Sequence, residues 1–248
     1  MSAGRGRADR HRPVEGVCGS ALVILMLLGG GGCRDNSAGP LTPHAHPPVV
    51  ILAVGDSLLF NTWGLDIYGD PLPGSYARTL WHVTAVADSF AGRQGVTTVL
   101  ESAFPAPPTP LVDTLHFAFM ANGDIYQFGF LARAVKRGGG PTIRPVWDRI
   151  AALSLPIDAT WVVGPRDSAG GDFVQGFFEG QNDYFSTSVN GVNTLCRGYT
   201  VTMTGTDLSC ALTVTDAPSA VLVFEQDATS SATGLLRILS SLTTGRPL

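Results

Sequence analysis

The sequence predicts a mainly β protein: a single antiparallel β-sandwich or half-barrel with at most one short helix. From Val49 onward, runs of β-branched and aromatic residues alternate with turn residues at intervals of roughly ten residues, which is typical of antiparallel strands. Gly and Pro are abundant, at 30 and 17 of 248 residues, and only 15% of residues are charged, against about 25% in an ordinary soluble domain. This composition excludes a coiled coil, a disordered acidic chain and a basic nucleic-acid-binding protein.

The N-terminal segment predicts export. Four arginines among the first 12 residues precede the apolar run Ala21–Leu28. This run is too short to cross a bilayer as a helix, which takes about 20 residues. A basic segment followed by a short apolar one is typical of a cleaved signal peptide, so we expect residues 1–32 to be removed.

The residues Gly30-Gly31-Gly32-Cys33 resemble the bacterial lipoprotein signal, in which small residues precede a cysteine that is lipidated and becomes the new N-terminus. The sequence departs from that signal at Gly30, where Leu is usual, and ordinary secretion with cleavage near Cys33 is the alternative. The resemblance implies that the protein contacts the membrane through lipid on Cys33. Because Arg34 stands where Asp commonly signals retention in the inner membrane, the outer membrane is the expected location.

Residues 33–48 have the Pro-rich composition of a tether between the lipid and a folded domain. His44 and His46 lie within it, but the sequence places no third metal ligand beside them, so we expect a solvated linker. The remaining histidines of the mature chain, His82 and His116, are expected on the surface. The sequence contains no P-loop, no GxGxxG and no CxxC pair, and we expect no cofactor and no bound metal.

Residues 49–248 are expected to form one antiparallel β-domain. A helix is expected only over Val146–Leu153, where Trp147 and Ile150 recur with helical spacing. The strands expected outside the hairpins are Leu58–Trp63, Thr79–Ala87, Val96–Leu100, Thr160–Val163, Phe173–Phe178, Ala220–Phe224 and Leu235–Leu239.

The pair Asn122-Gly123 predicts the clearest hairpin. In a two-residue type I′ turn both positions need positive φ, which Asn and Gly tolerate. This turn would place Phe119 opposite Tyr126 and Phe117 opposite Phe128, so that one face of the hairpin is wholly apolar.

Two further turns predict hairpins in the second half of the chain. Asn190-Gly191 would join residues 184–189 to 192–196, and Gly205-Thr206 would join residues 199–204 to 208–214. The pairs expected in the latter hairpin are Met203 with Leu208, Val201 with Cys210 and Tyr199 with Leu212.

The same register predicts that Cys196 and Cys210 are not bonded, although export would permit a disulfide. Cys196 lies five residues beyond the position opposite Cys210. That is about 17 Å along a strand, whereas a disulfide needs Cα atoms roughly 4 to 7 Å apart. We therefore expect no bond between them, and a kink of the chain after Arg197-Gly198 is the alternative that would permit one.

The segment Val49–Leu58 resembles the first block of the GDSL, or SGNH, esterase family, in which an apolar strand leads to a nucleophilic serine. The segment Gly180–Asp183 resembles the GxND block of that family. The resemblance implies Ser57 as the nucleophile, with Gly55, Asp56 and Asn182 around the oxyanion.

The third block of that family, Asp-x-x-His near the C-terminus, is absent, since the last histidine is His116. A serine hydroxyl needs an imidazole to take its proton. The expected hairpins also disagree with the parallel α/β sandwich of the family. We therefore expect no enzymatic activity and interpret the string at 55–58 as fortuitous, with a serine esterase using Ser57 as the alternative.

The same residues fit a structural role, in which Gly55-Asp56 is a turn that leads into a first strand over Ser57–Trp63. Four motifs follow along the chain: Val54–Phe60, Gly92-Arg93, Asn122–Tyr126 and Tyr199–Leu208. The order of these motifs, which covers most of residues 50–245, resembles that of uncharacterised bacterial lipoproteins built of consecutive hairpins. Some of those families form a curved half-barrel whose concave face holds an acyl chain. The resemblance implies a non-catalytic binding or structural module of the envelope, with an apolar small ligand and unspecified protein partners.

Overall fold

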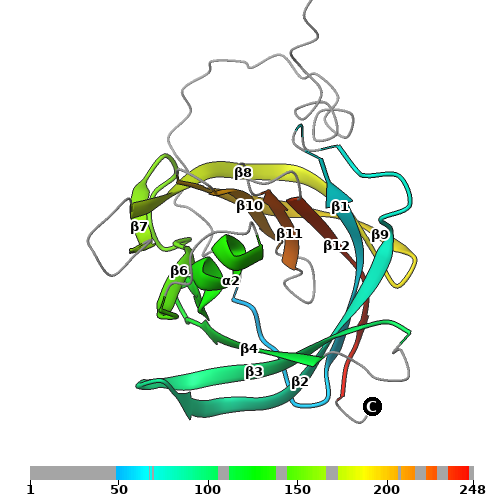
Figure 1. Ribbon diagram of the computed structural model, residues 1–248, viewed down its shortest axis with the longest axis horizontal. Coiled ribbons are helices and arrows are strands. Elements are labelled where there is room, and N and C mark those ends of the chain that lie inside the picture. The colour runs from blue at the N-terminus through cyan, green and yellow to red at the C-terminus, as the bar shows by residue number, and fades with distance from the viewer. Residues whose placement is uncertain are drawn as a thin grey trace, which may run out of the picture.

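The computed structural model describes residues 49–66, 68, 70–105, 112–137, 144–165, 173–205, 208–215, 222–227 and 234–245. In these residues, twelve strands form one antiparallel sheet that curls into a half-barrel around one short helix, α2 (Phe130–Arg137) (Figure 1). The predicted fold class is confirmed. The leader, Cys33 and the tether lie outside the described residues. Within the described part, no helix has the length and apolar character of a membrane span.

Every strand expected from the sequence overlaps an observed strand, and pairs of expected strands merge into the long β8 and β9. The strands are β1 (Ser57–Leu65), β2 (Ala77–Phe90), β3 (Arg93–Ala103), β4 (Val112–Phe119), β5 (Ile125–Phe128), β6 (Trp147–Ala151), β7 (Thr160–Pro165), β8 (Phe173–Val189), β9 (Val192–Gly205), β10 (Leu208–Thr215), β11 (Leu222–Asp227) and β12 (Gly234–Thr243).

The strands form a meander that closes on itself at the chain ends. Their order in the sheet is β6-β5-β4-β3-β2-β1-β12-β11-β10-β9-β8-β7, so β1 pairs with β12. The two edges of the sheet are β6 and β7, which are consecutive in the chain and lie side by side (Figure 1). The half-barrel is therefore interrupted along one line between β6 and β7, which we call the seam.

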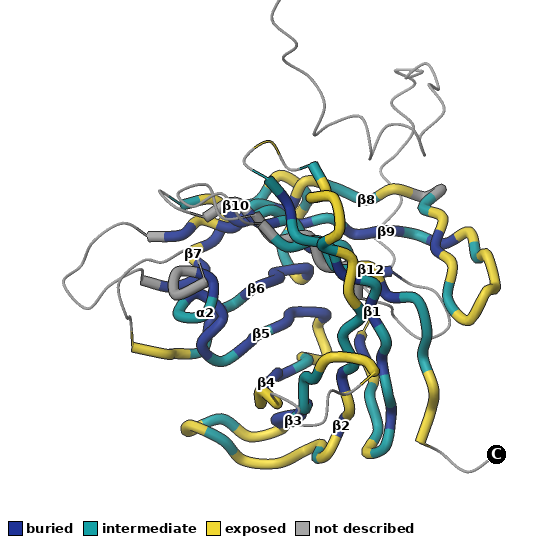
Figure 2. The backbone as a smooth tube through the Cα atoms, turned by 45° about the vertical axis from the view of Figure 1, so that its right-hand side comes forward, coloured by how far each residue is buried: buried dark blue, intermediate teal, exposed yellow. Residues whose placement is uncertain are grey.

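The apolar core lies on the inner face of the curled sheet. In β1 the alternation of a strand buries Leu58 and Phe60 on one face. The helix adds Phe130, Leu131 and Ala134 to the same core. Figure 2 shows buried positions along α2 and the middle of the strands, and exposed positions at hairpin ends such as that between β2 and β3. The inner face thus supplies one continuous apolar layer.

The helix predicted over Val146–Leu153 is wrong, because this segment contains strand β6. Asp148 and Ile150 are buried and Trp147 and Arg149 are half-buried, which is the two-residue alternation of a strand. A short segment with helical spacing has little helix stability of its own, so pairing with β5 decides its conformation. The helix of the structure, α2, follows β5 instead.

The Asn122-Gly123 hairpin forms, but the predicted register is wrong by one residue. Residues 121–123 make a three-residue loop in which Gly123 has φ of 89°. A loop that ends in a left-handed glycine is a common alternative to the two-residue turn. The extra residue moves Phe128 off the apolar face. The observed pairs are Phe117 with Gln127, Ala118 with Tyr126 and Phe119 with Ile125.

The predicted register between β9 and β10 is wrong by two residues, which leaves the same faces apolar. Cys210 lies opposite Met203 rather than Val201. Cys196 and Cys210 are both buried and are not joined to each other, so the predicted absence of a disulfide between them is confirmed. The Asn190-Gly191 turn is also confirmed, with φ of 55° and 73° at its two residues.

Candidate functional site

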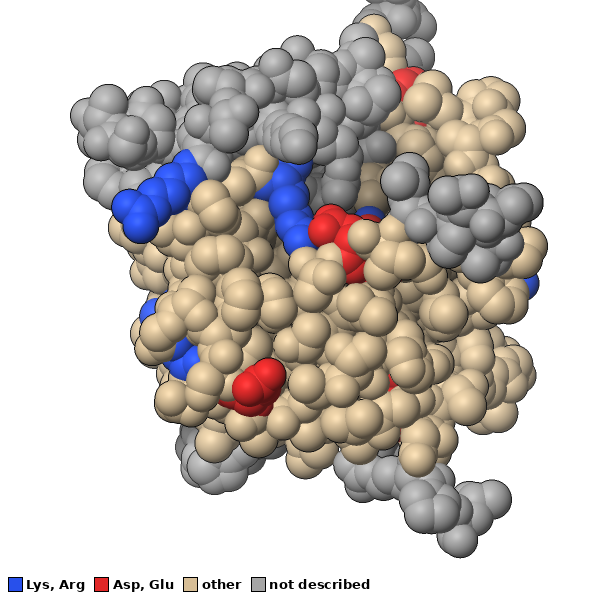
Figure 3. Space-filling model, turned by 60° about the horizontal axis from the view of Figure 1, so that its bottom comes forward, with Lys and Arg blue, Asp and Glu red and all other residues tan. Residues whose placement is uncertain are grey.

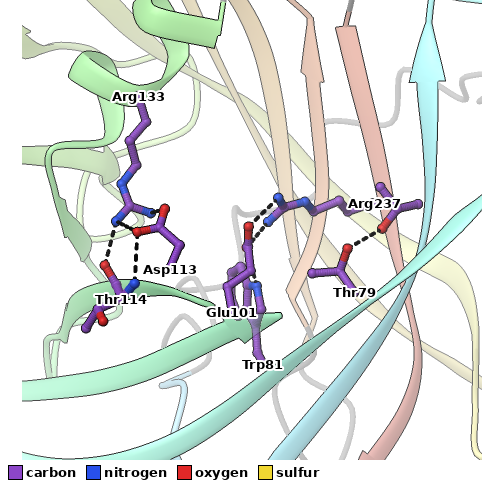
Figure 4. A network of polar contacts seen from close by, with 8 residues as sticks. Thr79, Trp81, Glu101, Asp113, Thr114, Arg133 and Arg237 are labelled. Atoms are coloured by element: carbon purple, nitrogen blue, oxygen red, sulfur yellow. Dashed lines mark hydrogen bonds and ion pairs between the residues drawn. The ribbon is translucent and has the colours of Figure 1, made fainter. Parts of the chain in front are cut away.

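Charged and hydroxyl side chains gather on the inner face at one end of the half-barrel. Inner positions of this sheet are otherwise mainly apolar, so these residues form the candidate site. They come from five strands and from α2, and most are drawn in Figure 4. We call them the inner polar cluster: Thr62 of β1, Thr79 and Trp81 of β2, Glu101 of β3, Asp113 of β4, Arg133 of α2 and Arg237 of β12.

An ion pair between Glu101 and Arg237 is the centre of the cluster. Nη1 of Arg237 donates to Oε2 of Glu101 at 2.6 Å and Nη2 donates to Oε1 at 3.0 Å. Trp81 Nε1 donates to Oε2 of Glu101, also at 2.6 Å. The side chains of Arg237 and Glu101 are only 13% and 19% exposed. Two parallel charge-assisted hydrogen bonds of this kind fix both groups in one orientation.

The sheet register explains why these two side chains meet. Arg237 lies opposite Thr62, two residues from the buried pair of Phe60 and Leu239, so it shares their inward direction. Glu101 lies opposite the buried Trp81. Because β1 and β2 separate β12 from β3 in the sheet, the ion pair spans the concave inner face. A curved sheet is needed to bring the two groups together.

A second ion pair fixes the helix to the sheet. Nη1 of Arg133 lies 3.1 Å from Oδ2 of Asp113, and Nη2 donates to the carbonyl of Thr114. The side chains of Arg133 and Asp113 are 30% and 62% exposed. An exposed pair of this kind contributes little to stability. It supplies a solvent-accessible charged rim beside the more buried pair of Glu101 and Arg237 (Figure 4).

Trp81 connects the polar cluster to the apolar core. Its ring lies 4.8 Å from that of Phe60 and 5.3 Å from that of Phe117, between ring centres. On the other side, the guanidinium carbon of Arg237 lies 5.9 Å from the centre of the Trp81 ring. The cluster is therefore amphipathic, with fixed charges directly beside buried aromatic rings.

Charge is sparse on one face of the molecule. Figure 3 shows this face as mostly uncharged, with a few scattered basic and acidic side chains. Within the described residues, no three His, Cys, Asp or Glu side chains lie close enough together to hold a metal ion. The chemistry that the inner polar cluster can supply is hydrogen bonding and ion pairing.

Ser57 and His82 form a separate polar pair on the outer face. They are cross-strand partners at the start of β1, and Ser57 Oγ lies 3.0 Å from His82 Nδ1. The structure thus supplies an imidazole for Ser57 from β2, which the sequence could not place because the pairing of the two strands was unknown.

The other residues of the esterase-like blocks lie apart or have structural contacts. Asp56 is buried and accepts hydrogen bonds from the N–H groups of Ala53 and Gly245. Asn182 is on β8, opposite Gly198, and four strands separate β8 from β1 in the sheet. The structure therefore joins Ser57 to His82 and does not place Asn182 on a neighbouring strand.

His116 belongs to an aromatic cluster outside the core. Its ring stacks on Phe90 with 3.6 Å between centres, and its Nδ1 lies 3.2 Å from Thr98 Oγ1. Desolvation lowers the pKa of His116, Arg133 lowers it further, and Asp88 opposes the shift. These contacts give His116 a packing role.

The sequence analysis missed the inner polar cluster, although one signal was present. Arg237 lies at the middle of the expected strand Leu235–Leu239, in which every other residue is apolar. A charged residue at such a position predicts a buried partner. The identity of that partner, Glu101, depends on strand order, which no local pattern contains. The predicted sites at Cys33, His44 and His46 lie outside the described residues.

No protein-family model matches this chain, and no curated protein matches it. One solved structure with a similar course of the chain is described as a "putative lipoprotein from Parabacteroides distasonis ATCC 8503". The two chains are 11% identical, the TM-score is 0.38, and the match covers 79% of this chain and 99% of the other.

Proposed function

We propose that this chain is a lipid-anchored envelope protein whose half-barrel is a non-catalytic binding module for a small amphipathic ligand. The observation that supports it most is the ion pair of Glu101 and Arg237, which spans the inner face directly beside Trp81. Replacing a buried ion pair by apolar residues is often neutral or stabilising. A role in recognition explains why such a pair stands on a mainly apolar face.

The ligand has a polar group and an apolar body. The polar group would bind at the ion pair, where Nε of Arg237 is buried and has no hydrogen-bond partner among the described residues. The apolar body would pack beside the ion pair, at the edge of Trp81, since burial of apolar surface supplies most of the affinity of such sites. An acyl chain with a carboxylate or phosphate end has this chemistry.

A fluorescent fatty acid tests this proposal. We expect purified protein to bind cis-parinaric acid saturably, and Arg237→Leu to weaken the binding by about tenfold or more, which corresponds to about 1.4 kcal/mol. The matched control is Arg78→Leu, because Arg78 also lies over an aromatic ring, that of Phe104, but outside the cluster. Absence of saturable binding by folded protein, or equal losses in both variants, would contradict the proposal.

The anchor is tested separately by fractionation. Cys33→Ser should release the protein from bacterial membranes into the soluble envelope fraction, because this residue is the expected lipid attachment site. Arg34, in place of Asp, supports the outer membrane as the destination, and separation of the two membranes on a density gradient checks it. Unchanged membrane retention of the Cys33→Ser protein would exclude lipidation at this residue.

A second candidate function rests on the contact between Ser57 and His82. An imidazole at 3.0 Å from a serine hydroxyl can take its proton, which is the first requirement for nucleophilic ester hydrolysis. If the chain is an esterase, purified protein hydrolyses p-nitrophenyl acetate and Ser57→Ala and His82→Gln each abolish the activity. Activity that survives Ser57→Ala excludes this function for the pair.

A further inference from the structure

Asp148 is a buried carboxylate whose charge no described side chain neutralises. It projects inward from β6 and is only 1% exposed. Its Oδ2 accepts a hydrogen bond from the N–H of Leu131, at the start of α2, at 3.0 Å. Its Oδ1 is buried and has no hydrogen-bond partner among the residues that the structure describes. Such an atom is rare in folded proteins because burial removes water that nothing replaces.

The unpartnered oxygen lies against the opposite side of the seam. A Cβ atom added to Gly164 of β7 would stand 2.4 Å from Oδ1 of Asp148 and 3.3 Å from Cδ1 of Leu131. The glycine is needed because β7 approaches Asp148 and α2 this closely. Asp148 therefore lies where three elements meet, namely β6, β7 and α2.

The charged groups near Asp148 are engaged elsewhere. On β6, Arg149 pairs with Asp124, with 2.6 Å between Nη2 and Oδ2. On α2, Arg133 pairs with Asp113. From β5 the facing residue is the neutral Gln127, and from β7 it is Gly164. Among the described side chains, none provides Asp148 with an opposite charge.

The seam lacks the backbone ladder that joins every other pair of neighbouring strands. In the described residues, the hydrogen bond that crosses from β7 to β6 runs from Trp161 Nε1 to the carbonyl of Arg149, at 2.7 Å. Buried apolar side chains of the core lie on both strands at this boundary, Ile150 on β6 and Val163 on β7. A boundary closed by side chains opens at a lower free energy than one closed by a ladder.

We propose that the seam is a pH-controlled opening of the half-barrel, which protonated Asp148 keeps closed and ionised Asp148 destabilises. The protonated carboxyl is uncharged and tolerates burial against Gly164. The ionised carboxylate loses water without gaining a cation, so the open form, in which water reaches Asp148, becomes more favourable. The inference depends on the seam alone and not on the proposed ligand.

The pH range of the opening follows from linkage. Desolvation raises the pKa of Asp148 to about 7 in the closed form, although backbone hydrogen bonds from Leu131 and Phe130 oppose the shift. In the open form the group regains water and a pKa near the ordinary value of about 4. The closed form therefore binds the proton more tightly, and the fraction of open molecules rises from about pH 4 to about pH 7 and is level above it.

Hydrogen exchange measured on the full chain tests the proposal. Labelling times are scaled to the intrinsic exchange rate at each pH, and peptides from β6, β7 and α2 are compared with peptides from β9 and β10. We expect protection at the seam to fall about tenfold per pH unit between pH 5 and pH 7 and to level off above that. Protection in β9 and β10 should not follow the same curve.

Asp148→Asn removes the ionisation and keeps an oxygen that can accept from the N–H of Leu131. Its seam peptides should show no loss of protection between pH 5 and pH 7, whereas the matched control, Asp88→Asn at an exposed carboxylate of β2, should behave as the parent protein does. Near-UV circular dichroism shows whether Asp148→Asn folds. If it does not, the dependence of seam protection on pH in the parent protein tests the proposal by itself. A flat curve at the seam, or the same curve in all peptides, would overturn the proposal.

Discussion

Glycine residues decide how closely side chains can pack beside the seam. A Cβ atom on Gly176 of β8 would lie 2.1 Å from Cε2 of the Trp161 ring, which is itself held by the hydrogen bond to Arg149. A Cβ atom on Gly64 of β1 would meet only ordinary contacts, the nearest being Ser75 Cβ at 3.4 Å. The two positions form a matched pair.

We therefore expect Gly176→Ala to reduce the free energy of unfolding by about 2 to 3 kcal/mol, because the added methyl group forces the indole ring out of its position. Gly64→Ala should change it by less than about 1 kcal/mol. Urea denaturation followed by tryptophan fluorescence measures both values. Similar losses at both positions would show that Trp161 is not held as tightly as its contacts indicate.

The ion pair of Glu101 and Arg237 allows a second comparison of single residues. Glu101→Gln leaves a guanidinium that is only 13% exposed without its counter-ion, and we expect a loss of about 2 to 4 kcal/mol. The double variant Glu101→Gln, Arg237→Leu should recover part of that loss. A double-mutant cycle by urea denaturation measures the coupling, and strictly additive losses would contradict a direct interaction.

Local patterns in the sequence predicted most strands, since each strand alternates apolar and polar residues over its own length. They failed where the conformation depends on a neighbouring element. The apolar spacing in Val146–Leu153 favours a helix locally, but β5 supplies a pairing partner and the segment becomes β6. The loop at Asn122-Gly123 contains one more residue than predicted. The length of this loop depends on which side chains of β4 and β5 pack into the core.

At the scale of elements, Asp148 makes the attachment of α2 to β6 depend on pH. Because burial raises its pKa to about 7, the folded state binds the proton more tightly than the unfolded state does. The free energy of unfolding should therefore fall by up to about 1.4 kcal/mol per pH unit from about pH 4 to pH 7 and be level above pH 7. The sign is opposite to that of a carboxylate in a salt bridge.

Asp148→Asn should flatten this dependence and make the protein more stable than the parent at pH 8, by about 1 to 3 kcal/mol. Urea denaturation at a series of pH values measures both curves. If the two proteins show parallel curves, other groups cause the dependence, and the burial of an ionised carboxylate at α2 is excluded.

On the scale of the whole molecule, the interruption of the sheet is far from the chain ends. The hairpin pattern predicted which strands are consecutive, but not that β1 would pair with β12 and leave β6 and β7 as edges. That closure joins residues far apart in the sequence, and no local pattern specifies it. For the same reason Arg237 and Glu101 could not be paired from the sequence.

Asp56 joins the two ends of the described domain. Its Oδ2 accepts from Ala53 N at 2.7 Å and its Oδ1 accepts from Gly245 N at 2.9 Å, beyond the end of β12. It is only 3% exposed. Asp66 is a matched control, because it also accepts from two N–H groups, those of Tyr68 and Asp70, but within one half-buried loop.

Asp56→Ala should reduce the free energy of unfolding by about 2 to 4 kcal/mol, since it leaves two N–H groups without their acceptor where water has little access. Asp66→Ala should cost about 1 kcal/mol or less, because water can replace the lost acceptor. Urea denaturation compares the two, and hydrogen exchange should show the loss of protection in both β1 and β12 for Asp56→Ala only. Equal costs would mean that the closure of the half-barrel does not depend on this carboxylate, and that pairing along β1 and β12 alone maintains it.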